Sequence, residues 1–128
     1  VNDYRVMSKR RLTIENKEIE EKLDGIEFYS ITVRGFKLDL EDRCEDFGQT
    51  ARYLGNDKED KCKFILDNGH TFHSRKPKLV CGNTADMLSE TRFKKYFEIT
   101  GNKSSHYGLF DCEENCPEPS PKKSTGCC

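Results

Sequence analysis

Cysteine is the residue type in this sequence with the most chemistry to offer, because seven cysteines occur among 128 residues. Cys112 and Cys116 have three residues between them, Cys127 and Cys128 are adjacent, and no paired Cys-x-x-Cys unit occurs. This spacing gives no support to a tetrahedral zinc site, so we expect no metal. So many cysteines in a short chain instead predict an oxidising compartment and at least two disulfides, whose pairing the sequence leaves open.

Histidine is the other residue type that could take part in catalysis. His70 and His73 flank two residues and would lie on opposite faces of a strand, which disfavours a shared metal ion or an acid–base pair. His106 lies in a loop rich in serine and glycine and is a candidate contact residue. A catalytic Cys/His pair stays open, although a cysteine in an oxidising compartment is more often bridged than nucleophilic.

The charge balance argues against a general affinity for nucleic acid, since Lys plus Arg is 22 and Asp plus Glu is 23. Basic residues do gather locally, and solvated surface is the simplest interpretation of each group. No apolar stretch approaches the roughly 20 residues of a membrane span, and no hydrophobic signal segment begins the chain. We therefore expect a mature, secreted protein that does not enter a membrane.

The elements that must position these side chains begin with a helix over residues 13–24. Thr13 is a suitable N-cap and Gly25 suits the position after the last turn. Ile19 and Leu23 recur at helical spacing and predict one buried face.

After Gly25 the hydrophobic period changes to two, which indicates strands over 28–33 and 36–40 joined at Arg34-Gly35. Residues 41–61 are polar and are predicted to form a long loop. Further strands are expected within 62–66, 71–73, 79–81, 93–100 and 108–112. Helix first and strands after predict an α+β fold in which a single helix packs on a central antiparallel sheet. The domain would span 1–112, and 113–128 would be a Pro/Lys/Cys-containing tail.

Three segments together resemble a known family. Tyr4-Arg5-Val6 followed by Leu12-Thr13 and a helix, the run 64–69 (Phe-Ile-Leu-Asp-Asn-Gly), and the run 97–112 ending in Phe-Asp-Cys are similar to fungal guanyl-specific ribonucleases and to the RNase-like secreted effectors of powdery mildew fungi. The resemblance spans about residues 4–112 and implies a disulfide-containing ribonuclease-like fold.

The family's catalytic side chains are missing from the matching positions. The glutamate position falls on Cys62, the arginine position near Met87 and the late histidine on Ile99. None of these three can carry out the proton transfers or the phosphate stabilisation of RNA cleavage. The resemblance therefore implies a pseudo-ribonuclease, not an enzyme, with no cofactor.

The function implied by the resemblance is that of a secreted fungal effector of a plant pathogen, with virulence and avirulence roles. It would enter the host cell as a monomer and bind a host protein, including a plant intracellular immune receptor, and RNA. The candidate contacts are Lys9, Arg10, Arg11, Tyr29, Phe72, Arg75, Lys76, Lys78, Arg92, Lys94, Lys95, His106 and Tyr107. Two alternatives stay open: an active secreted ribonuclease using relocated histidines, and a small disulfide-rich toxin.

Overall fold

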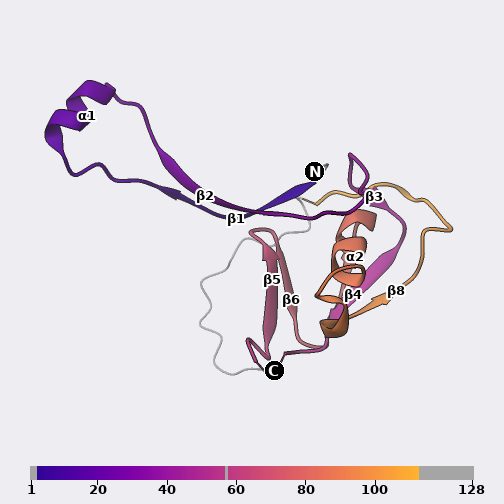
Figure 1. Cartoon of the computed structure of the whole chain (residues 1–128). Helices are drawn as coiled ribbons and strands as arrows, with labels where there is room; N and C mark the ends of the chain where they lie inside the picture. Colours follow the sequence, from indigo (N-terminus) through magenta and orange to yellow (C-terminus); the bar gives the residue numbers. More distant parts are fainter. Residues whose placement is uncertain (1–2, 57, 113–128) are drawn as a thin grey trace.

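The computed structural model describes residues 3–56 and 58–112 (Figure 1). A three-stranded sheet lies at its centre, with β4 (Gln49–Tyr53) between β7 (Pro77–Val80) and β8 (Phe97–Thr100), and both neighbours run antiparallel to β4. Alternate residues of β4 are buried, so one face of the strand supplies core side chains while the other is only partly covered.

Helix α2 (Gly82–Ser89) follows β7 after a single residue and packs against β4 and β8. Met87 and Leu88 are fully buried on this helix. The hydrophobic core therefore lies between α2 and the central sheet.

A β-hairpin also packs against the core. Strand β5 (Lys63–Asp67) pairs with β6 (His70–His73) through a turn at Asn68 and Gly69. The Phe72 ring lies 5.3 Å from that of Phe97 on β8, and the Phe64 ring lies 5.0 Å from the same Phe97 ring. Aromatic side chains thus join this hairpin to the central sheet.

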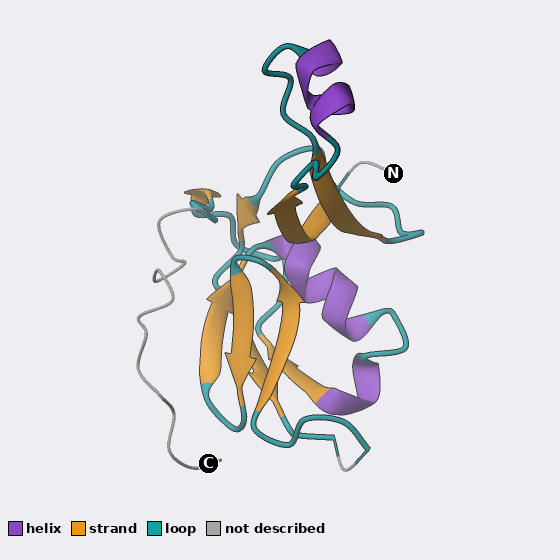
Figure 2. Ribbon diagram, turned by 90° about the vertical axis from the view of Figure 1, so that its left-hand side faces the viewer, coloured by secondary structure: helices purple, strands orange, loops and turns teal. Residues whose placement is uncertain are grey.

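The longest hairpin projects away from that core (Figures 1 and 2). Strand β1 (Tyr4–Arg11) pairs antiparallel with β2 (Tyr29–Gly35), and α1 (Lys17–Leu23) lies at the far end of the connection between them. No residue of α1 is buried. Several large apolar side chains of the two strands are exposed, among them Tyr4, Tyr29, Ile31 and Val33.

Two short elements complete the fold. Strand β3 (Glu45–Asp46) pairs antiparallel with β9 (Gly108–Leu109), and the 3-10 helix η1 (Lys94–Tyr96) precedes β8. Beyond the ladder itself, the Phe110 N–H donates to the Cys44 carbonyl at 2.8 Å. This pairing brings the chain before β3 beside the chain after β9.

The predicted fold class is wrong, because residues 3–56 and 58–112 contain two α-helices rather than a single helix packed on a central sheet. The predicted helix begins at Lys17 rather than at Thr13, since Asn16, not Thr13, accepts the N–H groups of Glu18 and Ile19. Ile19 is 48% exposed, so its spacing reflects no packing on the sheet. The second helix, α2, was missed because it begins with Gly-Asn-Thr and lacks a charged first turn.

The predicted hairpin of 28–33 with 36–40 is also wrong. Strand β2 ends at Gly35 and pairs with β1, which precedes α1 in the chain. Residues 36–40 form no strand, and Phe36 and Leu40 are buried instead. Strands β3 and β4 lie inside the segment 41–61 that was expected to be a loop.

The tail predicted at 113–128 lies outside the described residues, as do Cys116, Cys127 and Cys128. The domain boundary at residue 112 therefore stays a prediction. Among the described residues, neither helix has the length or the apolar character that crossing a bilayer requires.

Candidate thiol site

Three cysteines from distant parts of the sequence converge in the fold. Cys81 is the N-cap residue of α2, Cys44 precedes β3, and Cys112 follows β9. None of the three forms a disulfide, and their sulfur atoms all lie within 4.8 Å of one another. The short β3–β9 pair and the N-terminus of α2 therefore bring three thiols together at one point.

Cys81 is fully buried and is the acidic member of the cluster. A hydrogen bond from the Cys112 thiol is the largest influence on Cys81, and it outweighs burial. The Thr84 hydroxyl, the Thr84 backbone N–H and the charge of Arg5 act in the same direction, and together they lower the Cys81 pKa to about 5. Burial raises the pKa of Cys44, and its contact with Cys81 raises that of Cys112. The cluster thus holds one thiolate, on Cys81, beside two neutral thiols.

Arg5 on β1 supplies the positive charge. It is 7% exposed, and one nitrogen, Nη2, donates to the Thr84 hydroxyl at 3.0 Å and lies 3.9 Å from the Cys81 sulfur. Nη2 and Nε also donate to Asp3, each at 2.9 Å, and Nη1 donates to Asp67 at 3.2 Å. A buried guanidinium needs such partners, because an unpaired charge in the interior is strongly destabilising.

Asp67 extends the network to a histidine. Its Oδ1 atom lies 2.8 Å from Nδ1 of His70, and both residues are buried. Burial raises the Asp67 pKa, but the bond with His70, the Gly69 N–H and the Arg5 charge outweigh it and lower the pKa to about 2. The network therefore runs from His70 through Asp67 and Arg5 to the sulfur of Cys81.

Asn83, in the first turn of α2, ties the site to two further segments. Its side chain accepts from the Glu41 N–H at 2.9 Å and donates to the Glu41 carbonyl at 2.7 Å. The same amide donates to Asp3 at 3.2 Å. These bonds connect the start of β1, the segment that carries Cys44, and the helix that carries Cys81.

A cluster of three cysteines is suited to binding soft, thiophilic ions through its sulfur atoms. Thiolate is the sulfur ligand for thiophilic ions, and a structural zinc ion would want four ligands. Among the described residues, the group has three sulfur ligands and no fourth cysteine, histidine or carboxylate. The set therefore suits a three-coordinate thiophilic centre better than tetrahedral zinc, and the expectation of no metal-like ligand site overlooked it.

Sequence spacing carried no signal for this site. Cys81 follows Cys44 by 37 residues and precedes Cys112 by 31, so no local motif connects them. The prediction of a disulfide framework is wrong for these three cysteines, since none of them forms a disulfide. In the sequence, Arg5 stood out only as part of the Tyr4-Arg5-Val6 segment that resembles the ribonucleases. Nothing in the polar residues around it predicts that its side chain is buried.

The structure does not gather the predicted contact residues into one surface. Phe72 is fully buried, and the His106 Nε2 atom lies 2.7 Å from a Glu45 carboxylate oxygen. Lys9, Arg10, Arg11 and Tyr29 lie on the β1–β2 hairpin, Arg75, Lys76 and Lys78 lie around the start of β7, and Arg92, Lys94 and Lys95 lie between α2 and β8. Tyr107 is 69% exposed beside β9. A contact role for these residues stays a prediction.

The three positions matched to ribonuclease catalysis are likewise scattered. Met87 is buried in the core on α2, Ile99 lies on β8, and Cys62 precedes β5. Ile99 packs against the core, so it is a packing residue. These positions do not form a common site with a substrate-binding surface in the described part of the chain.

The chain is similar to proteins of a different class. An arsenite methyltransferase from Aquipseudomonas alcaligenes is 38% identical over 131 residues, an alignment that covers 98% of this chain and 38% of that protein. The crystal structure of an arsenic(III) S-adenosylmethionine methyltransferase from Chlamydomonas reinhardtii matches with a TM-score of 0.80 at 38% identity, covering 86% of this chain and 37% of that one. No family model matches the sequence. The chain thus spans well under half the length of these relatives.

These similarities overturn the resemblance to ribonuclease-like effectors. Nearly the whole chain aligns with a methyltransferase, so the assignments as a secreted fungal effector, as a ribonuclease relative and as a non-enzymatic pseudo-ribonuclease are wrong. The same similarities also contradict the two alternatives, a secreted ribonuclease and a disulfide-rich toxin. Secretion rested on counting cysteines as disulfides, and the three cysteines of the cluster form none. The predicted partners and the predicted monomeric state stay predictions.

Proposed function

We propose that this chain binds arsenite through Cys44, Cys81 and Cys112 and serves in arsenite methylation. The single observation that carries the proposal is the convergence of three cysteine sulfur atoms within 4.8 Å in a chain that is similar to arsenite methyltransferases. Trivalent arsenic forms three bonds and prefers sulfur to oxygen, so three thiols can satisfy its coordination.

The binding step is a ligand exchange in which no atom is oxidised or reduced. Arsenous acid carries three hydroxyl groups on arsenic. Each of the three cysteines replaces one hydroxyl and forms one arsenic–sulfur bond. The neutral Cys44 and Cys112 thiols each give a proton to a departing hydroxyl and release water, whereas the hydroxyl displaced by the Cys81 thiolate takes its proton from solvent. The Cys81 thiolate would attack first, because its pKa is about 5 and it is already ionised at neutral pH.

Arg5 and Thr84 would prepare this first step. After the hydrogen bond from Cys112, which is the largest influence, the Thr84 hydroxyl and the Arg5 charge also favour the ionised form of the Cys81 sulfur. The neutral Cys44 and Cys112 thiols then close the second and third bonds, each giving up its proton to a departing hydroxyl. This order uses the difference in acidity within the cluster.

The methyl donor of such a reaction is not held by the residues described here. The strand pairs of the four sheets are antiparallel, and the described residues contain no glycine-rich turn from a parallel strand into a helix, which is the usual cradle for a nucleotide-like cofactor. The described part of the chain therefore does not fit S-adenosylmethionine, and we assign no step of methyl transfer to its residues.

The direct test is an arsenite titration of the 128-residue chain in a buffer containing a phosphine reductant. We expect one arsenic per chain, with absorbance of arsenic–sulfur bonds in the near ultraviolet. Cys44→Ser, Cys81→Ser and Cys112→Ser should each weaken binding by at least tenfold, since each removes one of three bonds. Cys62→Ser is the control, because that residue lies outside the cluster. Unchanged binding in all three variants would refute the proposal.

A further inference from the structure

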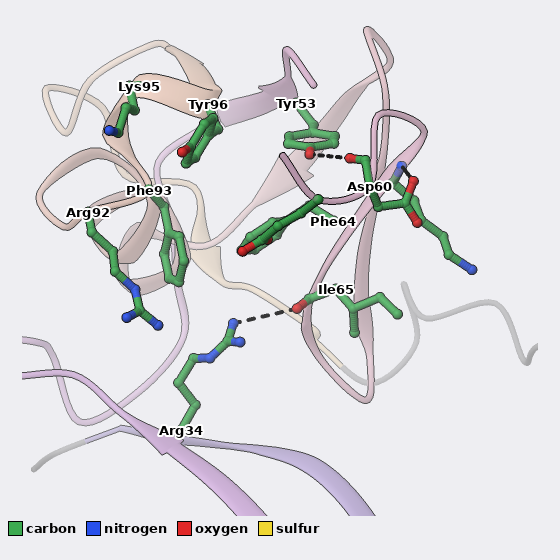
Figure 3. Close-up of a pocket in the computed structure, with 11 residues that line it drawn as sticks. Arg34, Tyr53, Asp60, Phe64, Ile65, Arg92, Phe93, Lys95 and Tyr96 are labelled. Atoms are coloured by element: carbon green, nitrogen blue, oxygen red, sulfur yellow. Dashed lines mark hydrogen bonds between the residues drawn. The ribbon is translucent and has the colours of Figure 1, made fainter. Parts of the chain in front are cut away.

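A cavity away from the thiol cluster combines positive charge with an aromatic wall. It has a volume of about 520 Å³, within the usual range of small-molecule sites, and opens between β2, β5 and η1 (Figure 3). Its aromatic lining comes from Tyr53, Phe64, Phe93 and Tyr96. No cysteine lines it, so it is distinct from the candidate arsenite site.

Two guanidinium groups enter this cavity from different segments. Arg34 on β2 lies 5.3 Å from the Phe93 ring centre and 5.9 Å from that of Phe64. Arg92, which follows α2, lies 5.1 Å from the same Phe93 ring. Figure 3 shows the Arg92 and Arg34 side chains converging below Phe93. Burial and the nearby Arg92 charge lower the Arg34 pKa, which means that like charges are held close together there.

The charges of Asp67 and Glu59 act on Arg34 and raise its pKa, without a direct ion pair in the described part of the chain. Among the described ion pairs, none involves Arg34 or Arg92. The Arg34 Nη1 atom donates a hydrogen bond to the Leu66 carbonyl at 3.0 Å and a weaker one to the Ile65 carbonyl at 3.5 Å. These bonds fix the guanidinium in place and leave its other nitrogens for a further acceptor.

Two acidic residues, Glu59 and Asp60, also line the cavity. Asp60 Oδ1 accepts from the Cys62 N–H at 2.8 Å and from the Lys63 N–H at 3.2 Å. The Tyr53 hydroxyl donates to the Asp60 carbonyl. Asp60 is therefore used in its own turn, and Lys63 and Lys95 add two more positive charges to the lining.

We propose that this cavity binds a small organic anion with a flat aromatic body. A carboxylate or phosphate of the ligand lies between Arg34 and Arg92, whose planar guanidinium groups suit two-oxygen acceptors. The aromatic body packs against Phe64 and Phe93, which gain contact area and exclude water from the ionic contact. Both features are needed together, since a bare anion finds only partly exposed charges and a neutral ring leaves the two arginines unpaired.

The test compares three probes on the 128-residue chain by isothermal titration calorimetry at low salt. 2-Naphthoate has both features, 2-naphthamide has the same rings without charge, and acetate has the charge without the rings. We expect 2-naphthoate to bind at least tenfold more tightly than either of the others. The 2-naphthoate affinity should fall as salt is added.

Arg92→Gln is the informative variant, because the side chain is exposed and its loss should leave the fold intact. We expect it to weaken 2-naphthoate binding by about tenfold, the usual loss for a charged hydrogen bond. Arg10→Gln, an exposed arginine on β1 outside the cavity, is the matched control and should bind as the parent does.

Equal affinity for 2-naphthoate and 2-naphthamide would overturn the proposal, because the arginines would then play no part. Equal affinity for 2-naphthoate and acetate would overturn it as well, by removing the aromatic contact. Binding that survives Arg92→Gln unchanged would place the anion elsewhere. These results are independent of arsenite binding, since the cavity contains none of the three cysteines.

Discussion

The Arg5 guanidinium lies 3.9 Å from the sulfur of Cys81, with the Thr84 hydroxyl in contact with both groups. A strand at the beginning of the chain thus places a buried positive charge at the first turn of α2, where the helix also favours a negative one. The arrangement stabilises a thiolate before any ligand arrives, and Asp3 and Asp67 hold the arginine in place.

The acidity of Cys81 should depend most on Cys112 and less on Arg5. The hydrogen bond from Cys112 is the largest influence on the Cys81 pKa of about 5, and the Arg5 charge is a smaller one. Cys112→Ala should therefore raise this pKa more than Arg5→Gln does. The thiolate absorbance in the ultraviolet, titrated with pH, measures it as a step that disappears in Cys81→Ser. A larger effect of Arg5→Gln would contradict this ranking.

Asp67 should make the fold sensitive to strong acid. Its pKa falls from an ordinary 3.8 to about 2 in the folded protein. A depressed carboxyl pKa stabilises the fold fully above the unfolded value and loses that stabilisation as the pH falls through the folded one. The window therefore runs from about pH 4 down to about pH 2, and the loss is about 2 kcal/mol.

Urea unfolding at several pH values would measure this loss. The parent should lose free energy of unfolding between pH 4 and pH 2 that Asp67→Asn does not lose, since the variant has no carboxyl to titrate. At neutral pH the variant should be less stable by about 3 kcal/mol, because Arg5 keeps its burial and loses a partner. Parallel pH profiles for the two proteins would show that another group is responsible.

Gly82 should be required for close packing beneath the thiol cluster. A Cβ at this position would lie 2.8 Å from Cε2 and 2.9 Å from Cδ2 of the Phe47 ring, which is closer than van der Waals contact. Gly82→Ala should therefore displace Phe47 and lower the free energy of unfolding by about 1–2 kcal/mol. Ser89→Ala, at the other end of α2, is the control for helix propensity and should change stability little. A stabilising effect of Gly82→Ala would contradict the packing argument.

Two leucines should differ sharply in their contribution to stability. Leu88 is fully buried on α2, whereas Leu23 is only half-buried on α1, a helix with no buried residue. We expect Leu88→Ala to cost about 2–5 kcal/mol and Leu23→Ala less than about 1 kcal/mol. Chemical denaturation of both variants measures the two costs. Similar losses would mean that α1 packs more tightly than its exposure indicates.

Local patterns identified several elements but not their arrangement. The runs at 62–66, 71–73 and 79–81 overlap β5, β6 and β7, because alternation and turn residues are local signals. The partner of β2 was not predictable in the same way. Strand β1 is separated from β2 by the whole of α1, whereas residues 36–40 follow β2 directly and alternate between apolar and charged residues. Phe36 and Leu40 nevertheless pack in the core and form no strand.

Sequence patterns could not predict the thiol site, and the reason is physical. A three-sulfur cluster assembled from separate segments needs no fixed spacing, unlike a zinc motif whose ligands share a turn. The number of cysteines therefore suggested bridges, and burial of Arg5 beside Cys81 emerged only in the fold. Free thiols and disulfides have the same composition, so composition could not distinguish them.

The separation of the three cysteines along the chain has a consequence for folding. Cys44 and Cys81 are 37 residues apart, and Cys81 and Cys112 are 31 apart, so an unfolded chain rarely brings all three sulfurs together. Arsenic bonded to all three would act as a three-way cross-link and would remove entropy from the unfolded ensemble, much as a disulfide does. The ion that the chain is proposed to bind would then also favour its folded form.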